Sequence, residues 1–523
     1  MNVLIFSRSF WARHSRTIHL TFGWFGGIAL LIWGISGIAH PIMSWTGPEQ
    51  AKFFPPKLSA DLSQLKSPVQ ILKSAGIDQA YLVRVAQSFD GAVLQVTDKK
   101  DAPRRYFSLK SGEELANRDQ EQAVWLARYY TGLKDEPVAK ITLQNTFDDD
   151  YPRVNRLLPI WRVEFASPDQ RRAYIYTEIN ALATQHNSNR YALQAVFQAL
   201  HTWRWLENFE NAQIVLMGGL MIALIGMSLT GIAMILSFKR RPIADKSKRW
   251  HRRIAYIVWL PIFAFSASGF FHLLQKRIGE NIRGMGEMQT MDLRPMLDTP
   301  AQIWKEAAGS GAANALSVVQ GADALLIRVE RPATDAMPSA AALEGGGEHA
   351  HHMPVTREQR FAGKSNHGGI IYYNAITGAA LHNYDQTMAH FLAVKLGGAR
   401  AENITGVEAV TRFGDGYDFR NKRLPVWQVN LNDDKSRSLY IDSGANMLID
   451  QSSQMQRIES YSFTYLHKWS FLRPLGRGVQ DGLIVGSIVL AMMATVFGFF
   501  MLWRQRQKRT TSIKKQVYAV PAE

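Results

Sequence analysis

Four long apolar runs dominate the pattern of hydrophobic and polar positions along the chain. Each run supplies the roughly 20 apolar residues that a helix needs to cross a bilayer, and a lone span must be helical to satisfy its own backbone. The first run is too long for the core of a signal peptide and has no clear cleavage site after it, so we interpret it as a retained span. The pattern predicts transmembrane helices at 18–40, 212–238, 254–274 and 482–503.

The segments outside the predicted spans, 41–211 and 275–481, carry mixed strand and helix patterns. Residues 80–98 alternate apolar and polar positions around the Asp90-Gly91 dipeptide, as the strands of a hairpin do. Residues 119–133 have helical spacing instead. We therefore expect α+β domains in which helices pack on antiparallel sheets.

The chain also contains an internal repeat. The stretch "LLPIWRVEF" at 157–165 returns as "RLPVWQVNL" at 423–431, and "ALHTWRWL" at 199–206 returns at the same offset as "YLHKWSFL" at 465–472. The spans repeat at a shorter offset, and the difference indicates an insertion in the second copy, around 338–359. We therefore predict a unit of span, external domain and span used twice. The expected fold is an internally duplicated all-α four-helix bundle in the membrane, with two external α+β domains.

The distribution of charge predicts how the spans are oriented in the membrane. The net charge is +16, and nearly all of the excess lies in segments 1–17, 239–253 and 504–523. Basic residues beside spans mark the cytoplasmic side. We expect a multi-pass protein of the bacterial inner membrane, with both termini cytoplasmic and the two large domains periplasmic. Nucleic-acid binding is disfavoured, because the basic residues adjoin the membrane ends rather than one soluble face.

The absence of cysteine limits the possible redox chemistry. It excludes disulfides, thiolate-held iron–sulfur clusters, cysteine zinc sites and covalently attached c-type haem. Any redox metal must therefore be held by nitrogen or oxygen ligands.

Histidines are the candidate ligands, because three pairs occupy equivalent positions in the two copies. The pairs are His19 with His251, His40 with His272, and His201 with His467. Ionisable groups in or beside a membrane span are costly and tend to be functional. Their other interpretation is as interfacial anchors or hydrogen-bond partners.

Helix geometry favours a shared role for the histidines of the first span. The 21 residues from His19 to His40 rise roughly 31 Å, about the thickness of the hydrocarbon core, and return to within about 60° of the same helix face. Around a twofold axis His19 then faces His251. Two neutral imidazoles on facing helices are a standard way to hold haem iron.

Two further groups of side chains leave alternatives open. The His-rich tract at 348–352 is either a metal site or a solvated loop. Trp203, Trp205 and Trp469 are interpreted mainly as an aromatic belt at the membrane interface, and an electron relay is the alternative interpretation.

These motifs resemble the PepSY-associated transmembrane-helix family. "RWHRRIAYIVWLPIFAFSASG" at 249–269 resembles its histidine-bearing helix, and "LHTWRWL" and "LHKWSFL" resemble the element before its next span. "YFSLKSGEEL" and "YYNAITGAAL" are similar to PepSY modules, so that the resemblance covers nearly the whole chain. Members include inner-membrane, haem-b-containing reductases of iron–siderophore complexes.

The resemblance implies haem b held by His19 and His251 on the cytoplasmic side, with His201 and His467 serving the periplasmic side. His40 and His272 are additions to the family pattern. Pairing of His40 with His467 and of His272 with His201 therefore stays open, as does a count of two or three haems.

We therefore expect a transmembrane oxidoreductase that passes electrons from an unknown cytoplasmic or quinone donor to a periplasmic ferric siderophore or other metal chelate. The alternative is a non-enzymatic transport accessory or protein-binding, inhibitory PepSY protein. An anionic chelate could be attracted by five basic residues, whose other interpretation is solvated surface: Arg153, Arg156, Arg420, Lys422 and Arg423.

Overall fold

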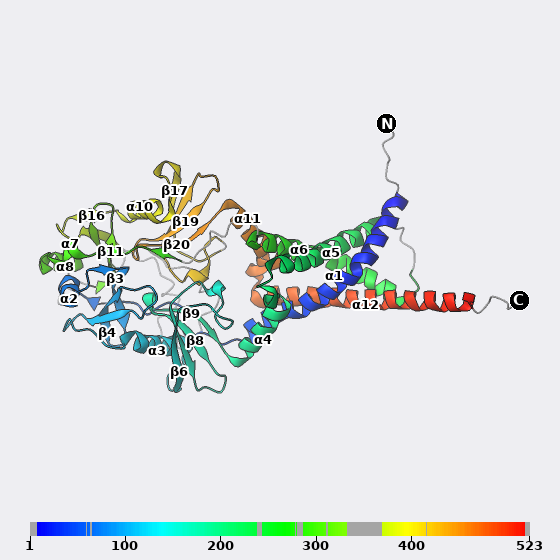
Figure 1. The fold of residues 1–523 in the computed structure, drawn as a ribbon, viewed down its shortest axis with the longest axis horizontal. Helices are drawn as coiled ribbons and strands as arrows, with labels where there is room; N and C mark the ends of the chain where they lie inside the picture. The colour runs from blue at the N-terminus through cyan, green and yellow to red at the C-terminus, as the bar shows by residue number, and fades with distance from the viewer. Residues whose placement is uncertain are drawn as a thin grey trace. The chain divides into compact units, whose positions relative to one another are not determined.

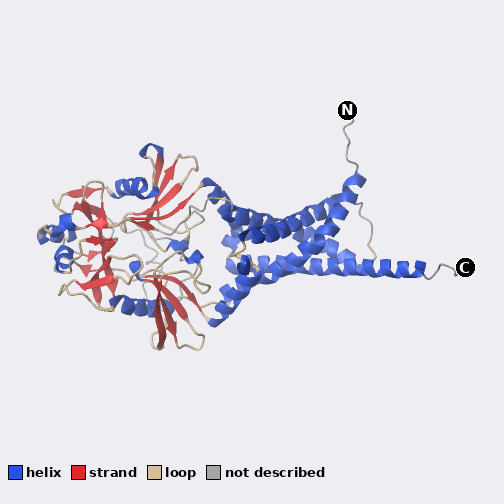
Figure 2. Cartoon of the chain, viewed as in Figure 1, coloured by secondary structure: helices blue, strands red, loops and turns tan. Residues whose placement is uncertain are grey.

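The computed structural model describes two compact units. One unit comprises Met1–Gly47, Asn189–Glu280 and Ile458–Glu523, and the other comprises Pro48–Ser188 and Asn281–Arg457. Figures 1 and 2 show that the first is helical and the second rich in strands. The described residues are 8–58, 60–62, 65–237, 243–277, 279, 286–309, 312–331, 369–414 and 416–517. The predicted His-rich tract at 348–352 lies outside them.

The helical unit is built from four long helices within the described residues. They are α1 (Arg8–Trp45), α5 (Glu210–Ser237), α6 (Lys246–Arg277) and α12 (Arg477–Val517). Each is long and apolar enough to cross a membrane. Both α1 and α6 pack against α5 and against α12. The prediction of a membrane protein with four such helices and α+β domains is confirmed.

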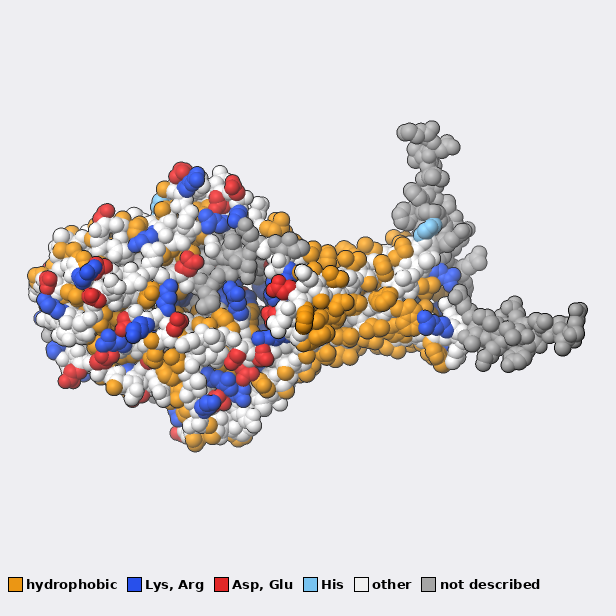
Figure 3. Space-filling model, in the orientation of Figure 1, with side chains coloured by type: hydrophobic (Ala, Val, Ile, Leu, Met, Phe, Trp, Pro, Cys, Tyr) orange, Lys and Arg blue, Asp and Glu red, His pale blue; other side chains and the backbone are white. Residues whose placement is uncertain are grey.

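The outer surface of these helices is apolar, as a lipid-facing surface must be. The space-filling view shows hydrophobic side chains covering the helices of this unit (Figure 3). Val215 is 70% exposed and Leu236 is 68% exposed, which would be unfavourable in water and is favourable in hydrocarbon. Small residues let the helices approach: a Cβ on Gly26 of α1 would lie 3.4 Å from the Ala223 backbone of α5. Such contacts are typical of membrane helix packing.

Short helical segments precede two of the spans. Helix α4 (Ser188–Leu200) and the 3-10 turn η3 (Arg204–Leu206) come before α5. Helix α11 (Gln454–Ser462), the π-turn η7 (Phe463–His467) and the 3-10 segment η8 (Ser470–Leu475) come before α12. His201 and His467 lie in these segments and not in the spans themselves.

The strand-rich unit contains three larger antiparallel sheets among the described residues. The seven-stranded sheet has the order β16 (Ala380–His382), β15 (Ile370–Asn374), β14 (Leu325–Glu330), β13 (Ala315–Gln320), β3 (Leu82–Ser88), β4 (Gly91–Thr97) and β5 (Arg105–Ser108). The four-stranded sheet comprises β6 (Val138–Gln144), β7 (Ile160–Phe165), β8 (Arg172–Tyr176) and β9 (Ala181–His186). The five-stranded sheet has the order β10 (Glu287–Met288), β20 (Met447–Ser452), β19 (Ser438–Asp442), β18 (Val426–Leu431) and β17 (Ile404–Val410).

The segments 41–211 and 275–481 share the seven-stranded sheet. Strand β3, from the first segment, pairs with β13, from the second, and aligns Val85 with Leu316 and Val83 with Val318. These side chains belong to one buried core. The segments predicted as separate domains are therefore joined by backbone hydrogen bonds, and their residue bounds as domains stay a prediction.

Two buried carboxylates, at equivalent positions of the sequence repeat, have matching roles in this unit. Asp119 lies in the first turn of α3 (Arg118–Thr131) and accepts a hydrogen bond from Trp161 Nε1 at 2.7 Å. Asp385 begins α10 (Asp385–Gly397) and accepts one from Trp427 Nε1, also at 2.7 Å. A carboxylate at a helix N-terminus is stabilised by the helix dipole. Each helix is thereby fastened to its own sheet.

Candidate functional site

His19 and His251 face each other inside the helical unit. They lie in α1 and α6, with ring centroids 6.3 Å apart and ring planes at 74°. His19 Nδ1 bonds the Met227 carbonyl at 2.9 Å, and His251 Nδ1 bonds the Ala494 carbonyl at 2.8 Å. A carbonyl can only accept, so Nδ1 carries the proton in both rings and Nε2 keeps its lone pair. Both imidazoles are therefore in the tautomer that can bind a metal through Nε2.

His201 and His467 form a second pair of the same kind. Their ring centroids lie 6.4 Å apart and their planes stand at 80°. Their Nδ1 atoms lie 3.1 Å from Ser36 Oγ and 3.2 Å from Ser268 Oγ, respectively. These serines belong to α1 and α6, so each short segment before a span is bonded to a different long helix.

Each of the four rings lies against a glycine of a neighbouring helix. A Cβ on Gly231 or Gly498 would lie 3.4 or 3.5 Å from Cε1 of His19 or His251, and one on Gly37 or Gly269 would lie 3.7 or 3.9 Å from Cε1 of His201 or His467. A Cβ at these positions would be in contact with the imidazole, and a longer side chain would enter the space of the ring. The glycines thus let a bulky ring sit between closely packed helices.

The turns that carry the second pair are fixed to the next helix. Trp203 and Trp469 both have a φ of 50°, in the left-handed region that closes each turn. Gln213 of α5 donates to the Thr202 carbonyl at 2.9 Å, and Gln480 of α12 donates to the Lys468 carbonyl at 2.6 Å. Both glutamines are buried, so these bonds form without competition from water.

His40 and His272 do not join either pair. His40 lies beside Phe197, and Phe197 stacks on His201; centroid distances are 6.0 and 4.6 Å. In the other copy, Phe463 lies 4.7 Å from His272 and 4.5 Å from His467. The structure thus brings His201 to His467, whereas it places His40 and His272 at the two ends of a row of six rings. Both end rings are exposed.

The two ends of this row differ chemically. His272 Nδ1 bonds Glu459 Oε1 at 2.6 Å. The equivalent of Glu459 in the first copy of the repeat is Leu193. The first copy therefore offers His40 no carboxylate at the position of Glu459. Among the described residues, the acid of helix α11 bonds the His272 ring and has no counterpart beside His40.

The spacing within both pairs leaves room for one metal ion between the two rings. An imidazole nitrogen bonds a transition metal at about 2.0–2.1 Å, so two imidazoles that bind one metal ion from opposite sides would have ring centroids roughly 6 Å apart. The observed 6.3 and 6.4 Å match this value. Among the described residues no group of three or more His, Asp or Glu side chains could hold a metal. Haem, which brings four nitrogens of its own, needs only the two that each pair offers.

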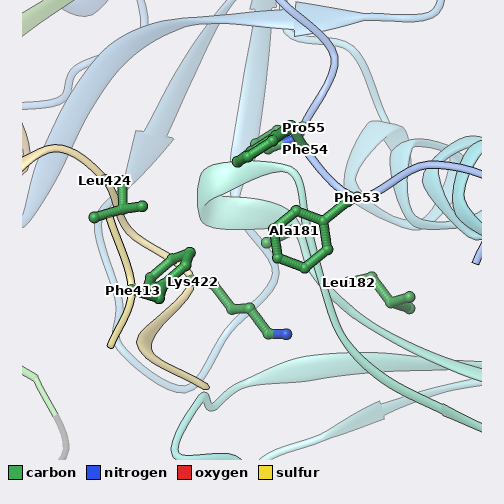
Figure 4. A pocket seen from close by; sticks show the side chains of 8 residues that line it. All are labelled: Phe53, Phe54, Pro55, Ala181, Leu182, Phe413, Lys422 and Leu424. Carbon is green, nitrogen blue, oxygen red and sulfur yellow. The ribbon is translucent and has the colours of Figure 1, made fainter. Parts of the chain in front are cut away.

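Two hollows of the strand-rich unit offer little room or free charge for a chelate. The first has a volume of about 30 Å³, well below the roughly 300 Å³ or more of a typical ligand pocket. Figure 4 shows its lining, which consists of Phe53, Phe54, Pro55, Ala181, Leu182, Phe413, Lys422 and Leu424. The second, an open hollow of about 550 Å³, includes Lys66 and Lys73. Lys66 already bonds the Ser111 carbonyl and Lys73 pairs with Asp298.

The basic residues proposed to attract an anion have internal partners in three cases. Arg423 is buried and bonds Glu178 at 2.5 Å and Asp442 at 3.0 Å. Arg156 pairs with Asp450, and Arg420 pairs with Asp418. The expectation of solvated surface is therefore wrong for Arg423, because its guanidinium crosses between the two copies inside the unit. Arg153 is exposed.

Several residues that shape the pairs were missed in the sequence. Gly231 and Gly498 contact the rings of the first pair, and Phe197 and Phe463 stack on the rings of the second. The signal was present, because the two phenylalanines occupy equivalent positions of the repeat and the two glycines are one position away from equivalence. Extending the repeat through the second and fourth spans would have found them.

Comparison with known proteins places the chain in one family. Among curated proteins none matches the chain. A family description, "PepSY-associated TM region", matches residues 16–506, which is nearly the whole chain and includes all six paired histidines. The chain belongs to the family of the PepSY-associated TM region.

Proposed function

We propose that the protein is a di-haem membrane cytochrome b that carries electrons across the bacterial inner membrane to a periplasmic ferric chelate. The observation that carries this proposal is the presence of two pairs of facing imidazoles. The ring centroids lie 6.3 Å apart in one pair and 6.4 Å apart in the other. His19 and His251 would hold one haem, and His201 and His467 the other. When bound, haem b supplies reversible one-electron chemistry at its iron.

The side chains of this protein prepare both sites in advance. Bonds from Nδ1 fix the tautomer and the orientation of each ring, as hydrogen bonds to ligand side chains do at metal sites. The glycines leave the rings room, and an apolar core lies between the four long helices. A hydrogen-bonded imidazole whose orientation is fixed needs little rearrangement when the charge of a bound metal changes, which favours electron transfer.

The proposed topology assigns each of the two histidine sites to one side of the membrane. The positive-inside rule places the basic termini and the 239–253 loop in the cytoplasm. His19 and His251 stand near the starts of α1 and α6, at that side, and the second pair stands near their far ends. The internally duplicated bundle then has one site near each membrane surface, and the strand-rich unit lies in the periplasm.

The acceptor in this proposal is a ferric siderophore, whose iron is released on reduction because Fe(II) binds hard oxygen donors less tightly than Fe(III). A purely accessory or inhibitory protein would have no use for two preorganised imidazole pairs. The test is to reduce the purified protein and mix it anaerobically with a ferric hydroxamate and a ferrous-iron indicator. Reoxidation of the cytochrome spectrum with one Fe(II) formed per electron supports the proposal, and a reduced spectrum unchanged by the chelate contradicts it.

A further inference from the structure

The row of six rings offers an electron two exits from the second histidine pair. Each end ring is separated from that pair by a single phenylalanine ring, and the centroid distances in the two halves are similar. His40 and His272, the two end rings, are both exposed. The rings alone therefore do not distinguish the two exits, whereas the charges around them do.

The end of the row at His40 is rich in positive charge. The charged groups that act most strongly on His40 are three cations and one carboxylate: Lys468, Arg477, Arg190 and Asp481. Contacts at the end of α1 place two of these cations there. A Cβ on Gly47 would lie 3.8 Å from Cδ of Arg190. Trp45 Nε1 bonds Asp481 at 3.2 Å, and Arg477 pairs with the same carboxylate at 3.0 Å.

The end of the row at His272 has carboxylates in balance with its cations. Glu459 bonds His272 Nδ1 at 2.6 Å, and Arg277 pairs with Glu210 at 3.1 Å. The charged groups that the structure describes around this end of α6 are Glu207, Glu210 and Glu459 with Arg204, Lys276 and Arg277. An anion near His272 is repelled by the carboxylate on the ring, whereas an anion near His40 is attracted.

The sequence repeat locates the differences that separate the two ends. Three positions matter, if Arg477 is aligned in the same way as the equivalent glutamines Gln480 and Gln213. Named with the His40 end first, the pairs are Arg190 and Gln456, Leu193 and Glu459, and Arg477 and Glu210. Each difference makes the His40 end more positive than the His272 end.

We propose that the acceptor is an anionic ferric chelate that docks at the His40 end of the row, attracted by Arg190 and Arg477, and receives its electron by way of Phe197 and His40. This inference rests on the proposed function and adds the class and the docking place of the acceptor. One electron leaves the His201–His467 site, which is oxidised, and reduces the chelated Fe(III) to Fe(II). No proton moves in this step, and the only bonds that break later are those between Fe(II) and its chelator.

The docking place is tested by the rate at which chelates reoxidise the reduced protein in lipid nanodiscs, measured anaerobically by stopped flow. The probes are Fe(III)–EDTA, which is anionic, and a cationic ferric trihydroxamate. At low salt the wild type should reach half of its maximal rate at a lower concentration of Fe(III)–EDTA, and added salt should remove this preference. His40→Ala and Arg190→Gln should each raise that concentration roughly tenfold and keep two haems per chain. Arg190→Lys keeps the charge and should behave as the wild type.

Two variants are the matched controls. His272→Ala removes the ring at the other end, and Arg153→Gln removes an exposed cation of the strand-rich unit; both should leave the concentration for Fe(III)–EDTA unchanged. Equal effects of His40→Ala and His272→Ala, or no preference for the anionic chelate at low salt, would overturn the inference. An unchanged value in Arg190→Gln would show that this cation serves only lipid headgroups or the fold, and would also overturn it.

Failure of the proposed function gives a different result, because a wild-type protein that no chelate reoxidises would contradict electron transfer itself. Should Arg190→Gln lose haem, the salt dependence of the wild type and the comparison of His40→Ala with His272→Ala still decide the docking place.

Discussion

His201 and His467 face each other at a centroid distance of 6.4 Å, although neither belongs to a membrane-spanning helix. Each ring is carried by a short segment before a span and reaches a serine of α1 or α6. His19 and His251 achieve nearly the same spacing from within the long helices. Two different local structures thus converge on one geometry, which is the basis of the predictions below.

Removing one ligand of the first pair should remove one haem. His19→Ala or His251→Ala leaves a single imidazole, which cannot complete two axial bonds, so the haem content should fall from two to one per chain. The measurement is extracted haem per mole of purified protein. His14→Ala is the matched control, since it lies on the same helix and is exposed; it should keep both haems. Loss of both haems, or of none, in the His19 variant would refute the pairing.

Removing either ring at the end of the row should leave the haem content unchanged. His40→Ala and His272→Ala delete imidazoles that contact Phe197 and Phe463 and no facing imidazole. The purified variants should retain two haems and an unchanged absorption spectrum. A wild-type content of three haems that falls in these variants would show instead that His40 or His272 is a ligand.

A bulky residue at a ring-contacting glycine should displace the ligand. Gly231→Leu puts a branched side chain where the His19 ring now lies, because even a Cβ there would be 3.4 Å from Cε1. We expect the haem of that site to be lost. Gly219→Leu on the same helix is the control, since no atom lies within 4 Å of its Cβ position. Equal haem content in the two variants would count against the close contact.

The buried ion pair of Arg423 should be essential for the strand-rich unit. Arg423→Ala leaves Glu178 in the interior with Arg104, at 3.7 Å, as its remaining ion-pair partner among the described residues. Breaking a buried pair by removing one partner costs about 3–5 kcal/mol. The unfolding midpoint of the full-length protein should fall accordingly, and that of the exposed control Arg153→Ala should change little. Similar midpoints for both variants would contradict an internal role for Arg423.

Asp385 should make the strand-rich unit sensitive to acid. Burial alone would raise the pKa of Asp385, but Arg328 and hydrogen bonds from Tyr372, Ser443 and Trp427 outweigh it and hold the pKa below its ordinary value. A carboxyl with a lowered folded-state pKa contributes stability above its unfolded pKa of about 3.9, and that contribution is lost as the pH falls through the folded pKa.

Unfolding measured between neutral pH and pH 3 provides the test. Asp385→Asn cannot titrate, so its stability should be lower at neutral pH and fall less steeply in acid than that of the wild type. Asp323→Asn, at an exposed position, should keep the wild-type profile. An acid limb of the same slope in Asp385→Asn would exclude this carboxyl as the source.

The sequence was sufficient to predict the four membrane-spanning helices and several β-hairpins. Apolar length marks a membrane helix. The predicted hairpin at Asp90-Gly91 exists as β3 and β4, but its turn is formed by Phe89 and Asp90, and Gly91 begins β4 opposite Ser88. Sequence alone did not predict that β3 pairs with β13, since pairing between distant strands depends on tertiary contacts and leaves no local pattern. For the same reason Arg423 was interpreted as solvated surface or as a residue that attracts an anion, and its pairing with Glu178 was not predicted.

The histidines illustrate a similar limit at the candidate site. Helix periodicity and the repeat were enough to set His19 opposite His251. The partner of His201 stayed open, because the turns at Trp203 and Trp469 take a φ of 50° that sequence patterns do not reveal. These turns, held by Gln213 and Gln480, bring His201 to His467 and leave His40 and His272 outside.

The most direct test of the central claim is the visible spectrum of the wild-type protein, purified from a haem-replete bacterial host, with its haem extracted and counted. We predict a Soret band with the reduced α-band of a low-spin, two-histidine cytochrome b, and two non-covalently bound haems per chain. His19→Ala and His201→Ala should each retain one, and the double variant none. A wild-type protein without a Soret band, or a double variant that still binds two haems, would contradict the account.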